Sequence, residues 1–539
     1  MKLELGDIMA SLTYTASFFD DWPPDSLGGG VITLRQATRM TYTSDQGYTV
    51  TLRGTGLTYD DDGLPSGGIV TGFVIVLNGV TLANLTGATV DFGRAGMQLF
   101  GFTRDNGRIE DPDPYSFIQS ALRGDDLVTG SDSDDDLRGG IGNDSINAGF
   151  GDDYIGAEAG HDTMDGGDGF DTLSYDEANW RWDSFQGVNL DAATGIAIDC
   201  FGFTDTFSNF ERYRDTLFAD TLKGADVDYE QFAVTRGNDL VNGRGGWDVL
   251  DYSRADRWGA QHGVNVNLAT GVGRDSWNGT DTISNIEEVR GTIFNDTLTG
   301  SARDEEFQGR AGIDVINGAG GFDHLAFWDS GENGLGRGIV INTTLAANVQ
   351  NDGYGNVETA LGIESYGGTR FGDRFTGGNE TNHFDGDDGN DTLNGGGGED
   401  FLNGGWGNDG LVGGSGDDHM GGGQDNDTLT GNTGNDDFNF GGPLNQQGID
   451  TITDMQVGLD EIWVDSEWGD LTAEFLVANQ FRGGAGATTA TTANHRVIYN
   501  STTGDLYYDV DGAGGAAAVR FAVLSNRAAI NFDDFHVFL

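Results

Sequence analysis

The chain has 539 residues, including 91 Gly, 6 Pro and a single Cys, and its 87 Asp and Glu against 28 Lys and Arg give a net charge of −59. This charge excludes nucleic acid as a partner, because the phosphates would be repelled, and the lone Cys200 excludes an intrachain disulfide. No stretch approaches the roughly 18 continuous apolar residues of a membrane helix, so no transmembrane segment is expected.

The first part of the chain, residues 1–115, is predicted to be a small antiparallel β domain. Its Thr-rich, alternating runs are typical of strands, and Asn78-Gly79 between two apolar runs indicates a hairpin. Asp60-Asp61-Asp62 lies in a Gly-rich loop and is interpreted as a solvated turn, with a calcium or glycan site as the alternative. The expected strands are 31–34, 48–52, 73–77 and 80–85.

A nine-residue unit recurs from residue 121 onward. Its template is G-G-x-G-x-D-x-U-x, with U a large apolar residue, and the clearest copy is Gly386–Asn394. A repeat this short cannot bury its apolar side chain alone, so the copies must stack on one another. Blocks of the repeat occupy residues 121–174, 234–251, 291–326 and 368–439, and the last block holds eight units in one register.

Two successive units are expected to form one coil of two turns and two short strands. Gly permits positive φ in each turn, so backbone carbonyls can point inward, and x-U-x forms a short strand with U facing the interior. Coils stack about 4.8 Å apart, so the carboxylates and carbonyls of facing turns surround a gap. About six oxygen ligands at flexible geometry suit Ca²⁺ better than Mg²⁺, and the absence of Cys and His from these positions argues against zinc.

The sequence therefore predicts multiple Ca²⁺ ions, with metal-free Asx turns as the alternative. The carboxylate ligands are expected from Asp126, Asp135, Asp144, Asp153, Asp162, Asp171, Asp239, Asp248, Asp296, Asp314, Asp323, Asp373, Asp391, Asp400, Asp409, Asp418, Asp427 and Asp436. The turn glycines expected to take part are Gly142, Gly151, Gly160, Gly169, Gly389, Gly398, Gly407, Gly416 and Gly434. The interior holds one apolar side chain per nine ordered residues, too little to offset the entropy of ordering them. The repeats are therefore predicted to unfold in low calcium and to fold cooperatively when calcium is supplied.

A longer repeat is superimposed on the short one. Asp171, Asp248 and Asp323 each end a block and lie 77 and 75 residues apart. A wider coil follows each of them and is expected to continue the solenoid. From about Phe440 the period stops, and a turn at Ser501–Gly504 between two strands predicts a β cap over the open strand edges. The expected domains are 1–115, the N-terminal β domain; 116–180, the first block; 181–251, 252–326 and 327–440, each a wider coil with a block; and 441–539, the cap.

The repeats and the C-terminal region resemble the RTX family of Gram-negative bacteria over about residues 121–539. The segment Tyr499–Gly512 is similar to the part that follows the family's arrays, and Phe532–Leu539 to its acidic-then-apolar terminus. The resemblance implies an all-β fold with a right-handed parallel β-roll, Ca²⁺ in its turns and an uncleaved C-terminal signal within 441–539. It also implies export by a type I ABC transporter to the outside or the cell surface, which fits a Met1–Asp20 segment without the features of a Sec signal peptide.

The sequence lacks the motifs of specific enzyme and toxin classes that carry such repeats. None of the seven His residues begins H-E-x-x-H, and G-x-S-x-G is not found, so an enzyme is less favoured than a structural role and no catalytic residue is assigned. With only Lys2 and Lys223, an acylated pore-forming toxin is disfavoured. We expect a secreted calcium-binding scaffold or surface protein, with a cell-surface polysaccharide or self-association as its further partner. The alternative is an extracellular carbohydrate-active enzyme or lectin, with its site in the N-terminal domain or in the wider coils. In those coils Trp180, Trp182, Trp258 and Trp277 either pack on the flank or stack on sugars.

Overall fold

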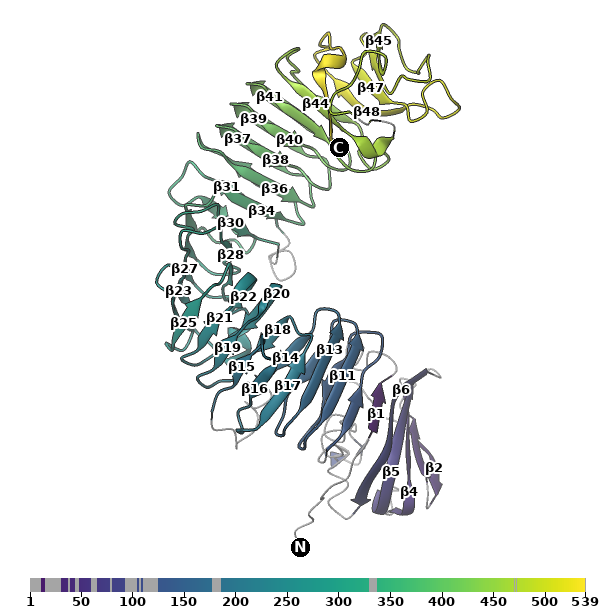
Figure 1. The fold of residues 1–539 in the computed structure, drawn as a ribbon, viewed down its shortest axis with the longest axis vertical. Coiled ribbons are helices and arrows are strands. Elements are labelled where there is room, and N and C mark those ends of the chain that lie inside the picture. Colours follow the sequence, from purple (N-terminus) through teal and green to yellow (C-terminus); the bar gives the residue numbers. More distant parts are fainter. Residues whose placement is uncertain are drawn as a thin grey trace. The chain divides into compact units, whose positions relative to one another are not determined.

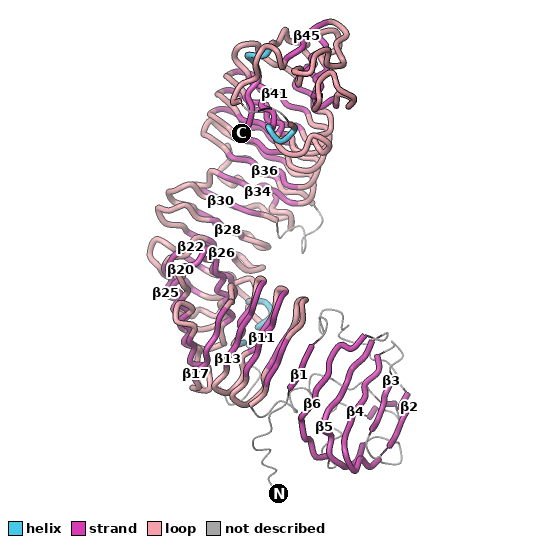
Figure 2. Tube along the Cα trace, turned by 45° about the vertical axis from the view of Figure 1, so that its right-hand side comes forward, coloured by secondary structure: helices cyan, strands magenta, loops and turns pink. Residues whose placement is uncertain are grey.

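The computed structural model describes residues 125–176, 186–328, 337–469, 471 and 473–538, together with the backbone of eight strands between residues 11 and 109. The chain forms two compact units, one of residues 1–259 with 271–286 and the other of residues 260–270 with 287–539. Every long element of the described residues is a strand (Figure 2), and no α-helix occurs among them. Nor does this part of the chain contain a helix with the length and hydropathy needed to cross a bilayer.

The N-terminal strands form an antiparallel sheet, as their alternating composition predicts. In this sheet β2 to β6 pair in chain order and β1 pairs with β6. Leu77 pairs with Val80 across the expected hairpin, whose Asn78 and Gly79 lie outside the described residues, as does Asp60-Asp61-Asp62. On its other edge β1 pairs in parallel with β9, so the sheet is continuous with the first repeats. The strands are β1 (Ser11–Tyr14), β2 (Val31–Gln36), β3 (Arg39–Thr43), β4 (Tyr48–Tyr59), β5 (Pro65–Leu77) and β6 (Val80–Phe92), and a separate pair is β7 (Arg104–Asp105) and β8 (Arg108–Ile109).

The first block forms a β-roll with two parallel sheets. Successive repeats contribute to opposite sheets, so β9, β11 and β13 pair on one side and β10, β12 and β14 on the other. Leu127 pairs with Ser145 and Ser145 with Thr163, which confirms a coil of two nonapeptides. The strands are β9 (Leu127–Thr129), β10 (Asp136–Arg138), β11 (Ser145–Phe150), β12 (Tyr154–Gly156), β13 (Thr163–Asp168) and β14 (Thr172–Ser174). The U residues Val128, Leu137, Ile146, Ile155, Met164 and Leu173 are all buried between the sheets.

The wider coil that follows continues the roll by inserting a three-stranded excursion. β17 pairs in parallel with β13, β16 lies antiparallel between β17 and β15, and β15 pairs in parallel with β19. On the opposite sheet β14, β18, β20 and β22 pair in parallel without an insertion. The remaining elements of this unit are β15 (Asn189–Asp191), β16 (Ile196–Ile198), β17 (Thr204–Ser208), β18 (Arg212–Arg214), β19 (Thr221–Lys223), β20 (Asp226–Ala233), β21 (Leu240–Asn242), β22 (Gly245–Asp251), η2 (Ala255–Trp258), β24 (Val272–Arg274) and β25 (Thr280–Ser284).

The second unit contains the long array, whose strands form successive rungs in Figure 1. One sheet runs through β35, β37, β39 and β41, and the other through β34, β36, β38, β40 and β42. Leu393, Leu402, Leu411, Met420, Leu429 and Phe438 form the two buried columns expected from the template. The array strands are β34 (Ser365–Thr369), β35 (Arg374–Thr376), β36 (His383–Asp387), β37 (Thr392–Gly397), β38 (Phe401–Asn403), β39 (Gly410–Ser415), β40 (His419–Gly421), β41 (Thr428–Thr433) and β42 (Asp437–Phe440). The strands before them are β23 (Asn265–Asn267), β26 (Glu288–Arg290), β27 (Thr297–Thr299), β28 (Glu306–Gln308), β29 (Val315–Asn317), β30 (His324–Ala326), β31 (Val340–Asn342), β32 (Val349–Asn351) and β33 (Thr359–Leu361).

The C-terminal region caps this roll by extending both of its sheets. β44 and β49 add to β42 in parallel, and β43 joins β41 to β48. The predicted hairpin is confirmed, with Asn500 pairing with Asp505 and Gly504 at φ 89°. Antiparallel pairing of β46, β47 and β48 ends the parallel stack. The elements are β43 (Asp450–Ile452), β44 (Glu461–Asp465), η3 (Ser466–Trp468), β45 (Phe481–Gly484), β46 (Val497–Asn500), β47 (Asp505–Tyr508), β48 (Val519–Leu524), η4 (Phe532–Asp534) and β49 (Phe535–Phe538).

Candidate metal sites

Each template Asp of the long array is held at the interface between two stacked coils. The backbone N–H of Asp391 donates to Oδ1 of Asp409 at 2.7 Å, and that of Asp409 donates to Oδ1 of Asp427 at 2.8 Å. The same bond links Asp400 to Asp418 at 3.0 Å on the other side of the roll. One carboxylate oxygen therefore fixes the side chain and leaves the second free to face the gap between turns.

That second oxygen has no hydrogen-bond partner in most template Asp residues, although it is fully buried. Leaving a buried polar atom unpaired costs about 1–3 kcal/mol, and more when it is charged. Such a series of unsatisfied oxygens at one fixed position is the arrangement expected of cation-binding turns. The residues whose unpartnered atom is Oδ2 include Asp144, Asp153, Asp171, Asp239, Asp314, Asp323, Asp391, Asp400, Asp409, Asp418, Asp427 and Asp436.

The turn glycines direct carbonyl oxygens toward the same gap. Gly407 has φ 132°, and a Cβ added there would overlap the carbonyl oxygen of Gly389 in the coil before it. A Cβ on Gly404 would lie 2.5 Å from both Asp409 Oδ2 and the carbonyl oxygen of Gly422. A free carboxylate oxygen and a carbonyl oxygen of the next coil are thus close enough to share one cation. The predicted turn glycines all have positive φ, namely Gly142, Gly151, Gly160, Gly169, Gly389, Gly398, Gly407, Gly416 and Gly434.

Burial makes these carboxylates hard to ionise without a counter-ion. Desolvation, with Asp373 and Asp409 nearby, raises the pKa of Asp391 to about 8. Desolvation and the neighbouring charges of Asp126 and other acids raise the pKa of Asp144 to about 8 in the first block. A cation between the turns would reverse this effect because it favours the charged form. An all-oxygen donor set of carboxylates and carbonyls is what Ca²⁺ requires, so the residues present fit that ion.

A subset of template carboxylates is instead satisfied by the protein. In several turns whose second template position is Ser or Thr, the N–H and hydroxyl of that residue donate to the carboxylate of the same turn. Thr292 N–H donates to Asp296 Oδ2 at 2.7 Å, and Thr369 N–H to Asp373 Oδ2 at 2.6 Å. Ser131 N–H also donates to Asp135 Oδ2, at 2.6 Å, but Asp135 Oδ1 is buried without a partner. In these turns the Ser or Thr at the second position can take the place of a cation as the partner of the carboxylate. The role of their template Asp residues as metal ligands stays a prediction.

Several carboxylates in equivalent positions were missed by the repeat template. In the wider coils the N–H of Asp162 donates to Asp205 and that of Asp239 to Asp281, both at 3.0 Å. A sequence signal did exist, since Thr204–Asn209 and Thr280–Asn285 read T-D-T-F-S-N and T-D-T-I-S-N. The other carboxylates that accept a template N–H are Glu211, Glu364, Asp450 and Asp460.

The tryptophans expected in the wider coils are only partly described. Trp258 lines a groove of about 330 Å³ together with Arg138, Arg214, Arg254 and Arg257. Trp277 is half-buried, and its N–H donates to Asp275 Oδ1 at 2.8 Å. Trp180 and Trp182 lie outside the described residues.

A family model of the RTX calcium-binding nonapeptide repeat, in four copies, matches residues 120–146, 138–173, 231–256, 290–325, 376–411 and 412–442. These ranges cover most of each repeat block, and repeats of this kind bind calcium at multiple sites. No curated protein matches the chain.

Proposed function

We propose that this chain, which carries RTX calcium-binding repeats, is a secreted protein whose β-roll folds on extracellular Ca²⁺ and serves as a scaffold or surface protein. The observation that carries the proposal is the row of buried carboxylate oxygens without partners, which recurs in most of the repeats. RTX repeats are typical of proteins exported by type I secretion. A chain of net charge −59 that lacks cations stays extended through self-repulsion, and an extended chain can pass an ABC transporter.

Calcium titration of the full chain tests the folding step. Circular dichroism should show weak β signal in EDTA and a cooperative increase as Ca²⁺ is added, because only the ion satisfies the free carboxylate oxygens. Mg²⁺ at the same concentration is the control and should produce little change, since it keeps its own waters. An unchanged β signal in EDTA would contradict the proposal.

Export can be tested separately. A passenger protein fused to residues 441–539 should appear in the medium of a Gram-negative host that carries a type I exporter. A fusion to residues 368–440 is the matched control and should stay in the cells. Retention of the first fusion in the cells would contradict a secretion signal in the cap.

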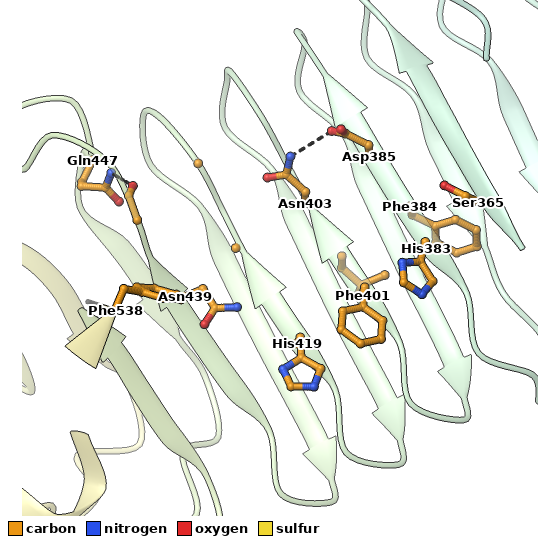
Figure 3. Close-up of a pocket in the computed structure, with 14 residues that line it drawn as sticks. Ser365, His383, Phe384, Asp385, Phe401, Asn403, His419, Asn439, Gln447 and Phe538 are labelled. Carbon is orange, nitrogen blue, oxygen red and sulfur yellow. Dashed lines mark hydrogen bonds between the residues drawn. The ribbon is translucent and has the colours of Figure 1, made fainter. Parts of the chain in front are cut away.

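A second candidate function, polysaccharide binding, is favoured by a groove on the outer face of the array. His383, Phe401 and His419 occupy one row of adjacent strands, and their rings stack with centroids 4.3 and 4.6 Å apart. Figure 3 shows this row beside a second row that includes Asp385, Asn403 and Asn439. The groove measures about 490 Å³. The stacked rings cover one another's faces and present their edges. Together with the neighbouring amide and carboxylate groups they form a polar groove that suits the hydroxyls of a sugar.

This location differs from the expected one, which was the N-terminal domain or the wider coils. Within the groove, His419 Nδ1 lies 2.8 Å from Asp437 Oδ2. Phe401→Ala should abolish retention of the calcium-loaded chain on an immobilised polysaccharide panel. Trp406→Ala, which removes a more exposed ring outside the groove, is the control and should leave retention unchanged. Equal retention of both variants would exclude the groove as the binding site.

A further inference from the structure

Three buried carboxylates meet at one pair of stacked turns in the first unit. Asp215 follows β18, Asp220 precedes β19 and Asp239 precedes β21, and each is at most 2% exposed. One carboxylate oxygen from each lies within 4.8 Å of the others. The turns are adjacent because β19 and β21 pair in parallel, Thr221 with Leu240. Two of the three residues, Asp215 and Asp220, lie outside the matched nonapeptide ranges.

Asp215 departs from the residue found at the same place in the two sister turns. The turns that open the later blocks have Gly291 and Gly368 at this first template position. A Cβ added at Gly291 would lie 2.5 Å from Asp296 Oδ2, and one at Gly368 would lie 2.6 Å from Asp373 Oδ2. A carboxylate at this position therefore enters the space directly beside the template Asp. Asp215 thus adds a third acidic group at a position where the two sister turns have Gly.

The extra carboxylate also changes the hydrogen bonding of its neighbour. Thr235 holds the second template position of its turn, from which Thr292 donates to its own Asp296. Thr235 instead donates its N–H and its hydroxyl to Asp215, at 2.7 and 2.8 Å. Asp239 Oδ2 is consequently left without a hydrogen-bond partner although the residue is 1% exposed. Asp239 therefore keeps an open oxygen in a turn that has Thr at the second position, whereas both oxygens of Asp296 accept hydrogen bonds.

The protein holds these three charges with neutral donors. Asp220 accepts hydrogen bonds from the N–H of Val188 and from the N–H and hydroxyl of Thr216. Asp215 accepts the two Thr235 bonds, and Asp239 Oδ1 accepts the N–H of Asp220 at 2.8 Å. Such donors orient the carboxylates but leave their repulsion uncompensated, which is costly in a buried site. A cation between the three oxygens would remove that cost.

We propose that Asp215, Asp220 and Asp239 form a Ca²⁺ site of a different kind from the array sites, with three carboxylates and a lower rate of ion release. The proposal rests on the calcium dependence of the proposed function and names a particular site within it. Calcium affinity rises with the number of charged ligands and with the rigidity of the site. Here the charge comes from Asp215 and the rigidity from the threonine hydrogen bonds.

The test follows calcium release from the full calcium-saturated chain after mixing with an excess of a fluorescent chelator. The wild-type chain should release most ions rapidly and one ion per chain at least about tenfold more slowly. Asp215→Asn should remove the slow phase and keep the fast one. Asp228→Asn removes an exposed acid of the same coil, and this control should keep both phases. Circular dichroism in saturating calcium reports whether each variant is folded.

Asp215→Gly keeps the test decisive if Asp215→Asn fails to fold, because it restores the residue of the sister turns. A slow ion that persists in the folded Asp215 variants would overturn the proposal. Fast release alone from the wild-type chain would overturn it as well, while leaving the calcium-dependent roll intact. A wild-type chain that releases no calcium in any phase would overturn the proposed function itself, so the two failures are distinguishable.

Discussion

The long array and the turns that open the later blocks use the same template Asp in two chemical settings. In the array, Asp409 Oδ1 accepts an N–H while its Oδ2 is buried and unpartnered. In an opening turn, Asp296 accepts the N–H of Val264 at 2.6 Å and that of Thr292 at 2.7 Å. The two turns differ at several template positions, among them the second, which is Gly405 in the array turn and Thr292 in the opening turn. The repeat therefore contains turns whose template carboxylate has an open oxygen and turns whose carboxylate is satisfied by the protein.

Removal of calcium should separate the two kinds of turn most strongly. Hydrogen exchange of the full chain in EDTA should show lost protection for the Asp391, Asp400 and Asp409 amides, because the coils that hold them repel one another without the ion. The amides that donate to Asp296 should keep more protection. Equal loss in both regions would show that the Thr does not replace the cation.

The pH dependence of the calcium-free chain should be the next largest effect. Burial raises the pKa of Asp391 from its ordinary 3.8 to about 8 and that of Asp436 to about 7. Between the ordinary pKa of 3.8 and these raised values, the folded state binds more protons than the unfolded state. The stability of the folded state therefore falls as pH rises. The contribution is fully present below about pH 4 and lost above about pH 8. Circular dichroism of the calcium-depleted protein should therefore show less β signal at pH 8 than at pH 5, and a stronger signal at pH 8 would contradict the sign.

A single methyl group should disrupt an array turn. Gly407→Ala combines an unfavourable φ of 132° with overlap on the Gly389 carbonyl, so we expect a loss of about 2–4 kcal/mol in the calcium-loaded state. Gly410→Ala is the matched control, since its Cβ would find only the Asp391 carbonyl at 3.9 Å. Denaturant unfolding in saturating calcium measures both, and similar midpoints would mean that the turn can relax.

Removal of one carboxylate should have the smallest effect and should distinguish the two kinds of turn directly. Asp409→Asn is expected to lower calcium affinity about tenfold at one site, because the free oxygen loses its charge. Asp296→Asn should lose mainly hydrogen-bond energy, about 1 kcal/mol, and retain more of its calcium. Equilibrium dialysis of both variants gives the number of bound ions. Equal calcium loss would show that Asp296 also binds the ion.

The repeat period predicted the parts of the fold that are local. The template positions predicted the buried column from Leu393 to Phe438 and the two-repeat coil, because each turn contacts only the turn one coil away. The three-stranded excursion β15–β16–β17 was not predictable in this way, since Thr163 pairs with Thr206 across 43 residues with no fixed period between them. The same applies to Asp205, which occupies a template role outside any template. Asp239 Oδ2 is open because Thr235 donates its hydrogen bonds to Asp215 and not to Asp239. The spacing of the repeats does not predict which of the two carboxylates Thr235 binds.

Alternation of repeats between the two sheets also limits how such a chain can change in length. The insertion of a single nonapeptide would move every later strand to the opposite sheet. Each later turn would then stack on a turn from the other side of the roll. The insertion or loss of two repeats restores the pairing of Phe401 with His419 and every register after it. The array should therefore gain or lose repeats in pairs. The number of repeats can then vary among related chains, but it should remain even or remain odd.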